Sequence, residues 1–283
     1  MKISWGNFLL DFSRKTCIMG ILNVTPDSFS DGGLHFDKSV AVGRGVRMVE
    51  EGADIIDIGG ESTRPGSDPL PLEEELQRVV PVIESLSAKV TVPISIDTYK
   101  AEVARRALDA GASIVNDISG LRFDPGMAGV VSASKVPVVV MHIKGSPRNM
   151  QQSPVYEALI PEILDYLRGS IAIALEAGVS EEKIIIDPGI GFGKTFDHNL
   201  EILHNLNRFA LLGRPILIGP SRKAFIGRIL DNAPPQERIY GTAAAVAISI
   251  MKEANIIRVH DVMEMVQVAR VADAVKREKV VLS

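Results

Sequence analysis

The sequence contains little of what several classes of protein require. Its 283 residues include a single cysteine, Cys17, which excludes a disulfide within one chain and a zinc site built from several thiolates. Aromatic residues are only 5% of the chain, and 31 Lys and Arg stand against 35 Asp and Glu, so a broad nucleic-acid surface is not expected. No stretch reaches the roughly 18 apolar residues of a membrane-spanning helix, and residues 1–10 lack the apolar segment of a leader. We therefore expect a cytoplasmic protein with neither nucleic-acid nor membrane partners.

The chain does have a regular alternation of short apolar runs and segments with helical periodicity. This order is typical of β-then-α units that surround a buried parallel sheet. The strands are expected at residues 16–23, 55–59, 93–97, 113–117, 136–142, 183–187, 215–219 and 256–259. Helices are expected between them. No linker or low-complexity segment interrupts the series, so we expect one domain over residues 1–283.

The junctions between helices and strands also repeat. Gly52, Gly111 and Gly178 each stand just after a helical segment and before an apolar run. A left-handed residue is needed at such a helix end, and glycine adopts that conformation without strain. Asn255 is expected to take the same position before the last strand, because asparagine is the usual second choice.

About eight βα units in roughly 250 residues match the (β/α)8 or TIM barrel, whose active site lies on the loops after the strands. A doubly wound open sheet is the alternative, but it would concentrate function near one switch point. Here polar side chains follow most of the strands, namely Asn23, Glu61, Ser62, Thr63, Arg64, Asp97, Asn116, Asp187, Lys223, Arg258 and His260. We therefore expect the closed barrel, which would bring these groups to one mouth.

Two loops near the N-terminus are candidates for binding. Asn23 ends the first strand, and a loop rich in Ser, Asp and Gly runs from it at least to Phe36. Ordinary turn chemistry would explain such a composition, but loops of this length in compact domains are more often functional. The second loop, residues 59–66, offers two glycines, hydroxyl groups and Arg64 to an anion. It is also compatible with a simple βα connection.

Three carboxylate or amide side chains end different strands. Asp97, Asn116 or Asp187 taken alone would often be a helix cap. As a set in one barrel mouth they suit the edge of a flat heterocycle with several N–H donors, because a carboxylate accepts two parallel hydrogen bonds.

The glycine-rich segment 187–195 does not match a phosphate loop, because Pro188 stands where the first glycine is required. Its glycines instead allow a ring to approach the backbone beside Phe192. Basic residues follow the last two strands. Ser221, Arg222 and Lys223 come where a strand meets a helix, and Arg258 and His260 have the i, i+2 spacing that points two side chains of a strand in one direction.

Taken together, these motifs resemble the dihydropteroate synthases, a family of pterin-binding barrel enzymes. The residues that carry the resemblance are 19–33, 59–66, 95–98, 116–120, 141–142, 187–195, 221–223 and 258–261. The resemblance implies a transferase of folate biosynthesis, a target of sulfonamides. It would condense 6-hydroxymethyl-7,8-dihydropterin diphosphate with 4-aminobenzoate and release diphosphate.

The resemblance also implies roles for individual residues. The catalytic set would be Asn23, Asp97, Lys223, Arg258 and His260. Substrates would be bound by Thr63, Arg64, Pro65, Asp97, Asn116, Met141, Asp187, Phe192, Gly219, Ser221, Arg222, Lys223, Arg258 and His260. Asn23 would ligate Mg²⁺, and the loops at 24–36 and 64–74 would be mobile. A homodimer through the late helices is the corresponding expectation for assembly.

Three other functions remain open from the sequence. A corrinoid methyltransferase could share the pterin-binding barrel, although it would not need Arg258 and His260 beside a diphosphate. A relative that binds pterin without turnover is a second alternative. A Schiff-base aldolase acting through Lys223 is the third, and it would be trapped by borohydride.

Overall fold

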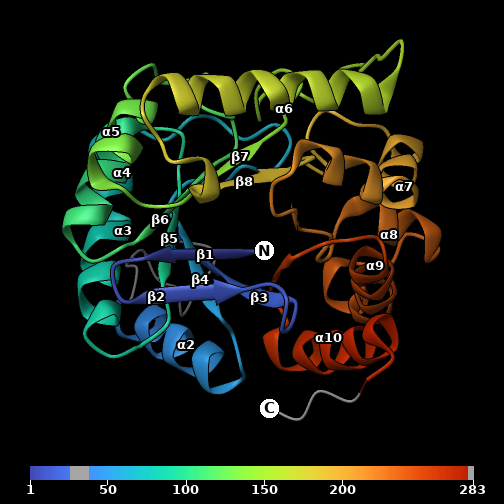
Figure 1. Cartoon of the computed structure of the whole chain (residues 1–283), viewed down its shortest axis with the longest axis horizontal. Coiled ribbons are helices and arrows are strands. Elements are labelled where there is room, and N and C mark those ends of the chain that lie inside the picture. The colour runs from blue at the N-terminus through green and yellow to red at the C-terminus, as the bar shows by residue number, and fades with distance from the viewer. Residues whose placement is uncertain (26–37, 280–283) are drawn as a thin grey trace.

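A computed structural model describes residues 1–25 and 38–279. Its central feature is a barrel of parallel strands (Figure 1), whose bounds are β3 Cys17–Asn23, β4 Ile55–Gly59, β5 Ile94–Asp97, β6 Ile114–Asp117, β7 Val138–Met141, β8 Ile184–Asp187, β9 Leu217–Ile218 and β10 Ile256–Val259. Their order is β8-β7-β6-β5-β4-β3-β10-β9, and a parallel bridge between Ile186 and Ile216 joins the two ends. The expected TIM barrel is confirmed, and the open sheet was the wrong alternative.

The helices surround this barrel as an outer layer (Figure 1). Their bounds are α2 Lys38–Glu50, α3 Leu72–Ser87, α4 Ala101–Asp109, α5 Met127–Ser134, α6 Leu159–Glu176, α7 Phe196–His204, α8 Ala224–Ile229, α9 Ile239–Met251 and α10 Val262–Arg277, with 3-10 turns at η1 Glu181–Lys183, η2 Leu206–Leu212 and η3 Pro235–Glu237. Both sides of the strands are therefore covered, which explains why β7, with the sequence Val-Val-Val-Met, is buried throughout. No helix in the described part of the chain combines the length and the apolar character needed to cross a membrane.

Helix α4 shows how the pattern of side chains orients this layer. Val103, Ala104 and Ala107 lie on one stripe and are fully buried. Arg105 lies on the exposed side, where it pairs with Glu102 at 2.6 Å. The apolar stripe packs inward because burial of apolar surface contributes most of the stabilisation available to an amphipathic helix.

Strand β9 is shorter than the expected 215–219. Pro215 has no N–H to donate to a ladder, but its carbonyl accepts from the backbone of Ile186 at 3.0 Å. Few hydrogen bonds therefore join β8 to β9, where the barrel closes. On its other side β9 pairs with β10 through Leu217 and Ile218 only.

An antiparallel hairpin precedes the barrel and was not predicted from the sequence. Strands β1 Lys2–Trp5 and β2 Phe8–Asp11 pair across a two-residue turn in which Gly6 has φ +48°. Ile3 and Leu10 face each other and are buried. The hairpin lies over one end of the barrel (Figure 1) and contacts η1, which leads into the start of β8. It therefore covers the amino ends of the strands, away from the expected site.

The helix-to-strand junctions are confirmed at the three glycines, since Gly52, Gly111 and Gly178 have φ values of +104°, +115° and +91°. The prediction for Asn255 was wrong. Glu253, two residues earlier, has the left-handed φ of +77°. The Asn255 side chain instead accepts a hydrogen bond from the backbone of Ile216 at 2.8 Å, so it fixes the start of β9.

Strand register then determines where the polar side chains meet. The Cα of Asn23 pairs with Gly59, Gly59 pairs with Asp97, and Asp97 pairs with Asn116. Four neighbouring strands thus end at one level. The carboxyl end of the barrel carries the predicted residues, as its topology requires.

Candidate active site

One arginine and two carboxylates form the centre of a pocket at the carboxyl ends of the strands. Arg258 donates from Nε to Asp57 Oδ2 and from Nη2 to Asp97 Oδ2, each at 2.6 Å. The Asp57 side chain is fully buried, and those of Asp97 and Arg258 are 11% and 20% exposed. Because the three residues come from β10, β4 and β5, one guanidinium ties together three strands. The fork geometry of arginine suits this double contact.

Asp57 was missing from the predicted site. It lies in the middle of β4, between Ile56 and Ile58, and a carboxylate inside such an apolar run is the signal that could have identified it. Asn116 also donates to its Oδ2, at 3.0 Å. Asp57 therefore holds both Asn116 and Arg258 in place from beneath the pocket.

Asp97 retains an oxygen for a ligand. Its Oδ1 atom is buried and has no hydrogen-bond partner among the described residues. Burial raises the pKa of Asp97 to about 7, with Asp57 adding to the rise and Arg258 opposing it. Above neutral pH the group is a carboxylate that can accept an N–H from a bound molecule.

Asp187 and Lys223 complete the charged lining. Asp187 Oδ1 accepts from the backbone N–H of Gly189 at 2.7 Å, and burial raises the pKa of the carboxyl to about 6. Lys223 Nζ lies 4.4 Å from the centre of the Phe192 ring, a cation–π distance. Burial and the neighbouring Arg258 lower the pKa of Lys223 to about 8, although Asp187 opposes this.

These side chains line one pocket. Its wall consists of Asp97, Asn116, Ile118, Met141, Asp187, Ile190, Phe192, Gly219, Lys223 and Arg258. Most of the residues predicted to bind the heterocycle are therefore brought together. The wall combines polar and charged groups with apolar side chains, a combination that suits a ligand with an apolar body and a polar edge.

The loop after β8 is held by a buried lysine. Lys194 Nζ contacts His142 Nδ1 at 2.7 Å and donates to the carbonyl of Phe192 at 2.9 Å. Gly189 has φ +69°, and a Cβ there would lie 1.9 Å from the carbonyl oxygen of His142. This close approach explains the glycine, and it places Phe192 against the pocket.

A second group of predicted residues lies beside the pocket rather than in its lining. Ser221 Oγ is 2.9 Å from His260 Nδ1 and accepts from the His260 backbone at 3.2 Å. Burial and Arg258 lower the pKa of His260 to about 3, so the imidazole is neutral at physiological pH. Arg222 makes a two-point contact with Asp261, at 3.0 and 2.5 Å. This partner of Arg222 was not predicted from the sequence.

The loop after β4 places its predicted residues near the surface. Thr63 is half-buried, and Arg64 and Pro65 are exposed. None of the three lines the pocket. The loop expected at 24–36 lies, from residue 26 onward, outside the described residues, whereas Asn23 is half-buried at the end of β3.

Few side chains in the described part of the pocket could ligate a metal ion. Within residues 1–25 and 38–279, no cluster of three or more His, Cys, Asp and Glu side chains could hold a metal ion. Mg²⁺ is commonly bound through one or two protein oxygens together with substrate phosphates and water. The amide oxygen of Asn23, at the same level as Asp97, fits a site of that kind, in which the substrate supplies most of the ligands.

Fold and site together define a barrel enzyme with a buried acceptor-rich pocket for a flat nitrogen heterocycle. Residues 19–260 match the family model of pterin binding enzymes. The chain is 49% identical over 272 residues to a dihydropteroate synthase of Synechocystis sp., covering 96% of this chain and 94% of that protein. It is 51% identical over 265 residues to one of Bacillus subtilis, covering 94% and 90%. The chain therefore belongs to the dihydropteroate synthase family of pterin-binding enzymes, which are transferases.

Solved structures agree with this assignment. A Yersinia pestis dihydropteroate synthase in complex with a sulfonamide drug superimposes with a TM-score of 0.92 at 43% identity, over 99% of this chain and 100% of that one. The Xanthomonas albilineans enzyme has been solved with 4-aminobenzoic acid, with a TM-score of 0.89 at 45% identity and 95% coverage of both chains. It has also been solved with 7,8-dihydropteroate, with a TM-score of 0.85 at 42% identity, over 95% of this chain and 96% of that one.

Proposed function

We propose that the chain condenses 6-hydroxymethyl-7,8-dihydropterin diphosphate with 4-aminobenzoate to give 7,8-dihydropteroate and diphosphate, and that it depends on Mg²⁺. The observation that carries this proposal is the single pocket shared by Asp97, Asn116, Asp187 and Lys223. The complexes of related enzymes with 4-aminobenzoic acid and with 7,8-dihydropteroate support it.

The pterin would fill the pocket. Asp187 keeps one oxygen beyond the bond to Gly189, and Asp97 has a buried Oδ1 without a protein donor, so both can accept from ring and exocyclic N–H groups. The side chains of Phe192 and Met141 offer apolar surface to the ring. Asp57 would contribute from beneath, since it holds Arg258 and Asn116 in position.

The diphosphate would lie toward Asn23, His260 and Arg258. Arg258 uses Nε and Nη2 for Asp57 and Asp97, so its charge reaches the leaving group from a fixed position. His260, being neutral, would act as a hydrogen-bond donor rather than as a cation. Mg²⁺ held with Asn23 would add positive charge at the departing oxygens.

No activated protein nucleophile is needed, because the amine of 4-aminobenzoate attacks the pterin carbon itself. We infer that the C–O bond to diphosphate breaks first and that the cation left on the pterin methylene is delocalised into the ring. Asp97, ionised and beside the heterocycle, would stabilise that cation electrostatically. Rates that rise steeply with amine nucleophilicity across a series of 4-aminobenzoate analogues would contradict this order of events.

The direct test is incubation with both substrates, with Mg²⁺ or with a chelator, followed by measurement of diphosphate and 7,8-dihydropteroate. We expect equal amounts of the two products, and loss of both when the metal is removed. Pterin binding without either product would instead identify a protein that has lost turnover. Trapping by borohydride with a carbonyl substrate, abolished by Lys223→Met, would favour the aldolase.

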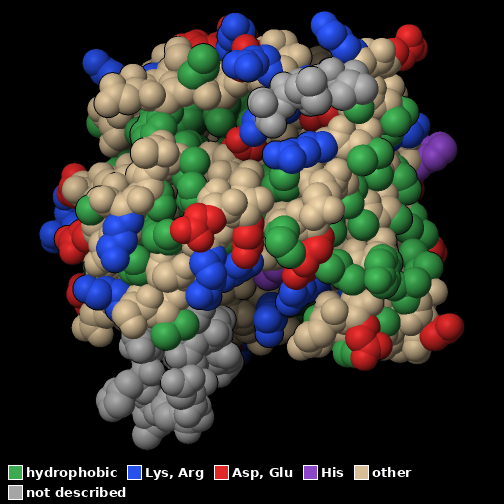
Figure 2. All heavy atoms as spheres, turned by 90° about the horizontal axis from the view of Figure 1, so that it is seen from below, with side chains coloured by type: hydrophobic (Ala, Val, Ile, Leu, Met, Phe, Trp, Pro, Cys, Tyr) green, Lys and Arg blue, Asp and Glu red, His purple; other side chains and the backbone are tan. Residues whose placement is uncertain are grey.

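We also propose that the chain forms a homodimer through α9 and α10. These helices pack against each other, yet Ile248, Met251, Val271 and Val275 remain 47% to 67% exposed. Exposed hydrophobic side chains gather on the side of the molecule where the two helices lie (Figure 2). Sedimentation should give the mass of a dimer, and Val271→Asp should shift it toward that of a monomer; a wild-type monomer at micromolar concentration would refute this assignment.

A further inference from the structure

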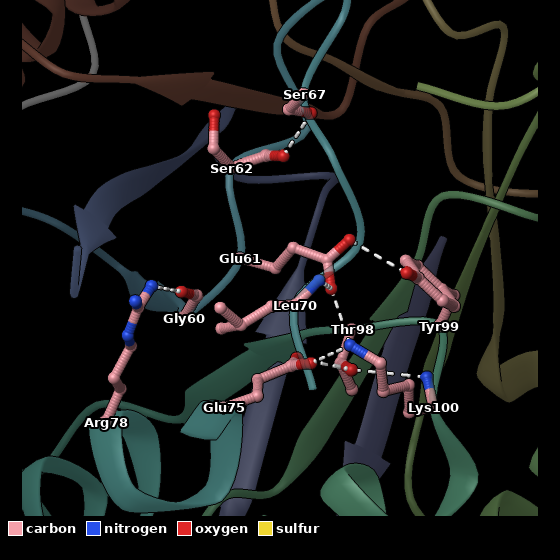
Figure 3. Close-up of polar contacts among 10 residues, drawn as sticks. All are labelled: Gly60, Glu61, Ser62, Ser67, Leu70, Glu75, Arg78, Thr98, Tyr99 and Lys100. Carbon is pink, nitrogen blue, oxygen red and sulfur yellow. Dashed lines mark hydrogen bonds and ion pairs between the residues drawn. The ribbon is translucent and has the colours of Figure 1, made fainter. Parts of the chain in front are cut away.

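A buried ion cluster lies next to the active-site pocket and has no role in the reaction described above. Lys100 Nζ donates to Glu61 Oε2 at 2.5 Å and also contacts Glu75 Oε2 (Figure 3). The Glu61 and Glu75 side chains are 6% and 1% exposed, and that of Lys100 is 18% exposed. One ammonium group therefore joins two carboxylates that are almost entirely removed from water.

The position of this cluster in the chain indicates what it holds. Glu61 follows the end of β4 by two residues, and Glu75 lies in the first turn of α3. The intervening loop, residues 62–71, is thus gripped at both of its ends by Lys100. Glu61 Oε2 also accepts from the backbone of Leu70 at 3.1 Å, which draws the two ends of the loop together.

The same cluster connects this loop to the pocket. Thr98 follows Asp97 directly, and its hydroxyl donates to Glu75 Oε1 at 2.8 Å. Tyr99, the next residue, donates to Glu61 Oε1 at 2.8 Å (Figure 3). Three consecutive residues after Asp97 therefore bond to the two glutamates, and all four carboxylate oxygens of these glutamates have partners.

The charge balance makes Lys100 the residue on which the cluster depends. Without it, two desolvated carboxylates would face each other with no cation between them, an arrangement that is strongly unfavourable unless the site opens or a proton is taken up. Burial already raises the pKa of Glu75, and Lys100 opposes this rise. If the two glutamates moved apart, the loop would be displaced. The ion pairs of Arg258 with Asp57 and Asp97 would remain, because Lys100 is not part of them.

We propose that Lys100, with Glu61 and Glu75, is a positioning clamp that sets the loop carrying Thr63, Arg64 and Pro65 against the Asp97 segment. The pterin fills the pocket in the proposed function, and this loop stands outside the pocket lining. The clamp therefore governs recognition of the second substrate, 4-aminobenzoate. The inference rests on the proposed function. Lys100 is a positioning residue because it acts through the loop and lines no part of the pocket. The two substrates should therefore respond differently to its loss.

The test compares Lys100→Met with the wild type in steady-state kinetics for each substrate. We expect KM for 4-aminobenzoate to rise about tenfold, the size of effect that a small misplacement of a binding group produces, while KM for the pterin diphosphate changes less than about twofold. Lys100→Arg keeps the charge and should restore most of the loss. Glu61→Gln keeps the size of the side chain and should raise the same KM by a smaller factor.

Lys15→Met is the matched control, because Lys15 pairs with Asp54 at 2.5 Å near the amino end of β3, away from the pocket. It should leave both KM values unchanged. Amide hydrogen exchange of residues 62–71 gives a second readout, and it should be faster in Lys100→Met and in Glu61→Gln but not in the control. This measurement also applies to any variant too unstable for kinetics.

Two results would overturn the clamp. One is an unchanged KM for 4-aminobenzoate with unchanged exchange of the loop. The other is an equal loss for both substrates that Lys100→Arg does not recover, which would indicate general destabilisation. Failure of the proposed function is distinguishable, because the wild-type chain would then release no diphosphate from the two substrates.

Discussion

Replacing Asp57 by Asn tests the pairing at the centre of the pocket. The asparagine keeps the shape of the side chain and removes its negative charge. That charge raises the pKa of Asp97 directly. Its loss in the variant should therefore lower the pKa of Asp97 from about 7.

The magnitude follows from Coulomb's law. Two carboxylates about 5 Å apart, the order of separation expected when both contact one guanidinium, repel each other by about 3 kcal/mol at an effective dielectric constant of about 20. Since one pKa unit corresponds to about 1.4 kcal/mol, the pKa of Asp97 should fall by about 1 to 2 units once relaxation is allowed for. Arg258 would also keep only one of its two partners, so we expect a stability loss of about 2 kcal/mol, below the 3–5 kcal/mol of a fully broken buried pair.

The assay is the pH dependence of kcat/KM for the pterin diphosphate, which reports groups of the free enzyme. Asp97 must be ionised to stabilise a cation electrostatically, so activity should fall as the pH drops through about 7 in the wild type. In Asp57→Asn this acidic limb should move to lower pH, even though the maximal rate is reduced. Asp54→Asn, at the amino end of the strands, is the control and should leave the limb in place. A limb that stays fixed or moves to higher pH in Asp57→Asn would show that Asp57 does not raise the pKa of Asp97.

Three further predictions concern the segment after β8. Asp187→Asn should unfold at a higher temperature than the wild type at pH 8, because a carboxyl whose folded pKa is raised to about 6 destabilises the ionised protein by up to about 3 kcal/mol. Calorimetry should show that this difference in unfolding temperature vanishes toward pH 4, where the carboxyl is protonated. Gly189→Ala should lose at least about 2 kcal/mol of stability in urea titrations, because its Cβ would lie 1.9 Å from the His142 carbonyl; a loss below about 0.5 kcal/mol would contradict that geometry. Burial lowers the pKa of Lys194 far below its usual value, so the free energy of unfolding should rise more steeply between pH 7 and 9 in the wild type than in Lys194→Met. Parallel plots of this free energy against pH would show that Lys194 is ionised in the folded state.

Much of the barrel could be predicted because local signals repeat. Apolar strands followed by helical periods gave the expected order, and two strands, β4 and β10, have the expected bounds. The hairpin at Lys2–Trp5 and Phe8–Asp11 escaped prediction because two four-residue strands carry little pattern. Asn255 was misplaced by two residues because its preference for a helix end gave way to a side-chain bond with Ile216.

The site was predicted only in part, and the reason is the range of the interactions. A polar residue at a strand end is visible in the sequence, so Asp97, Asn116 and Asp187 were found. Asp57 was not found, because its role comes from Arg258, which lies 201 positions away in the chain. The partner of Arg222 was missed for the same reason, since Asp261 is 39 positions distant.

Local sequence patterns are enough to specify the alternation that builds the barrel and the polar residues that emerge at its carboxyl end. Which charges are paired there depends on the closed barrel: Arg258 pairs with Asp57 and Asp97, and Lys100 pairs with Glu61 and Glu75. Periodicity is a local property that each strand or helix expresses alone. The energy of a charge depends on its distance from other charges and from water, and those distances exist only once the sheet has closed.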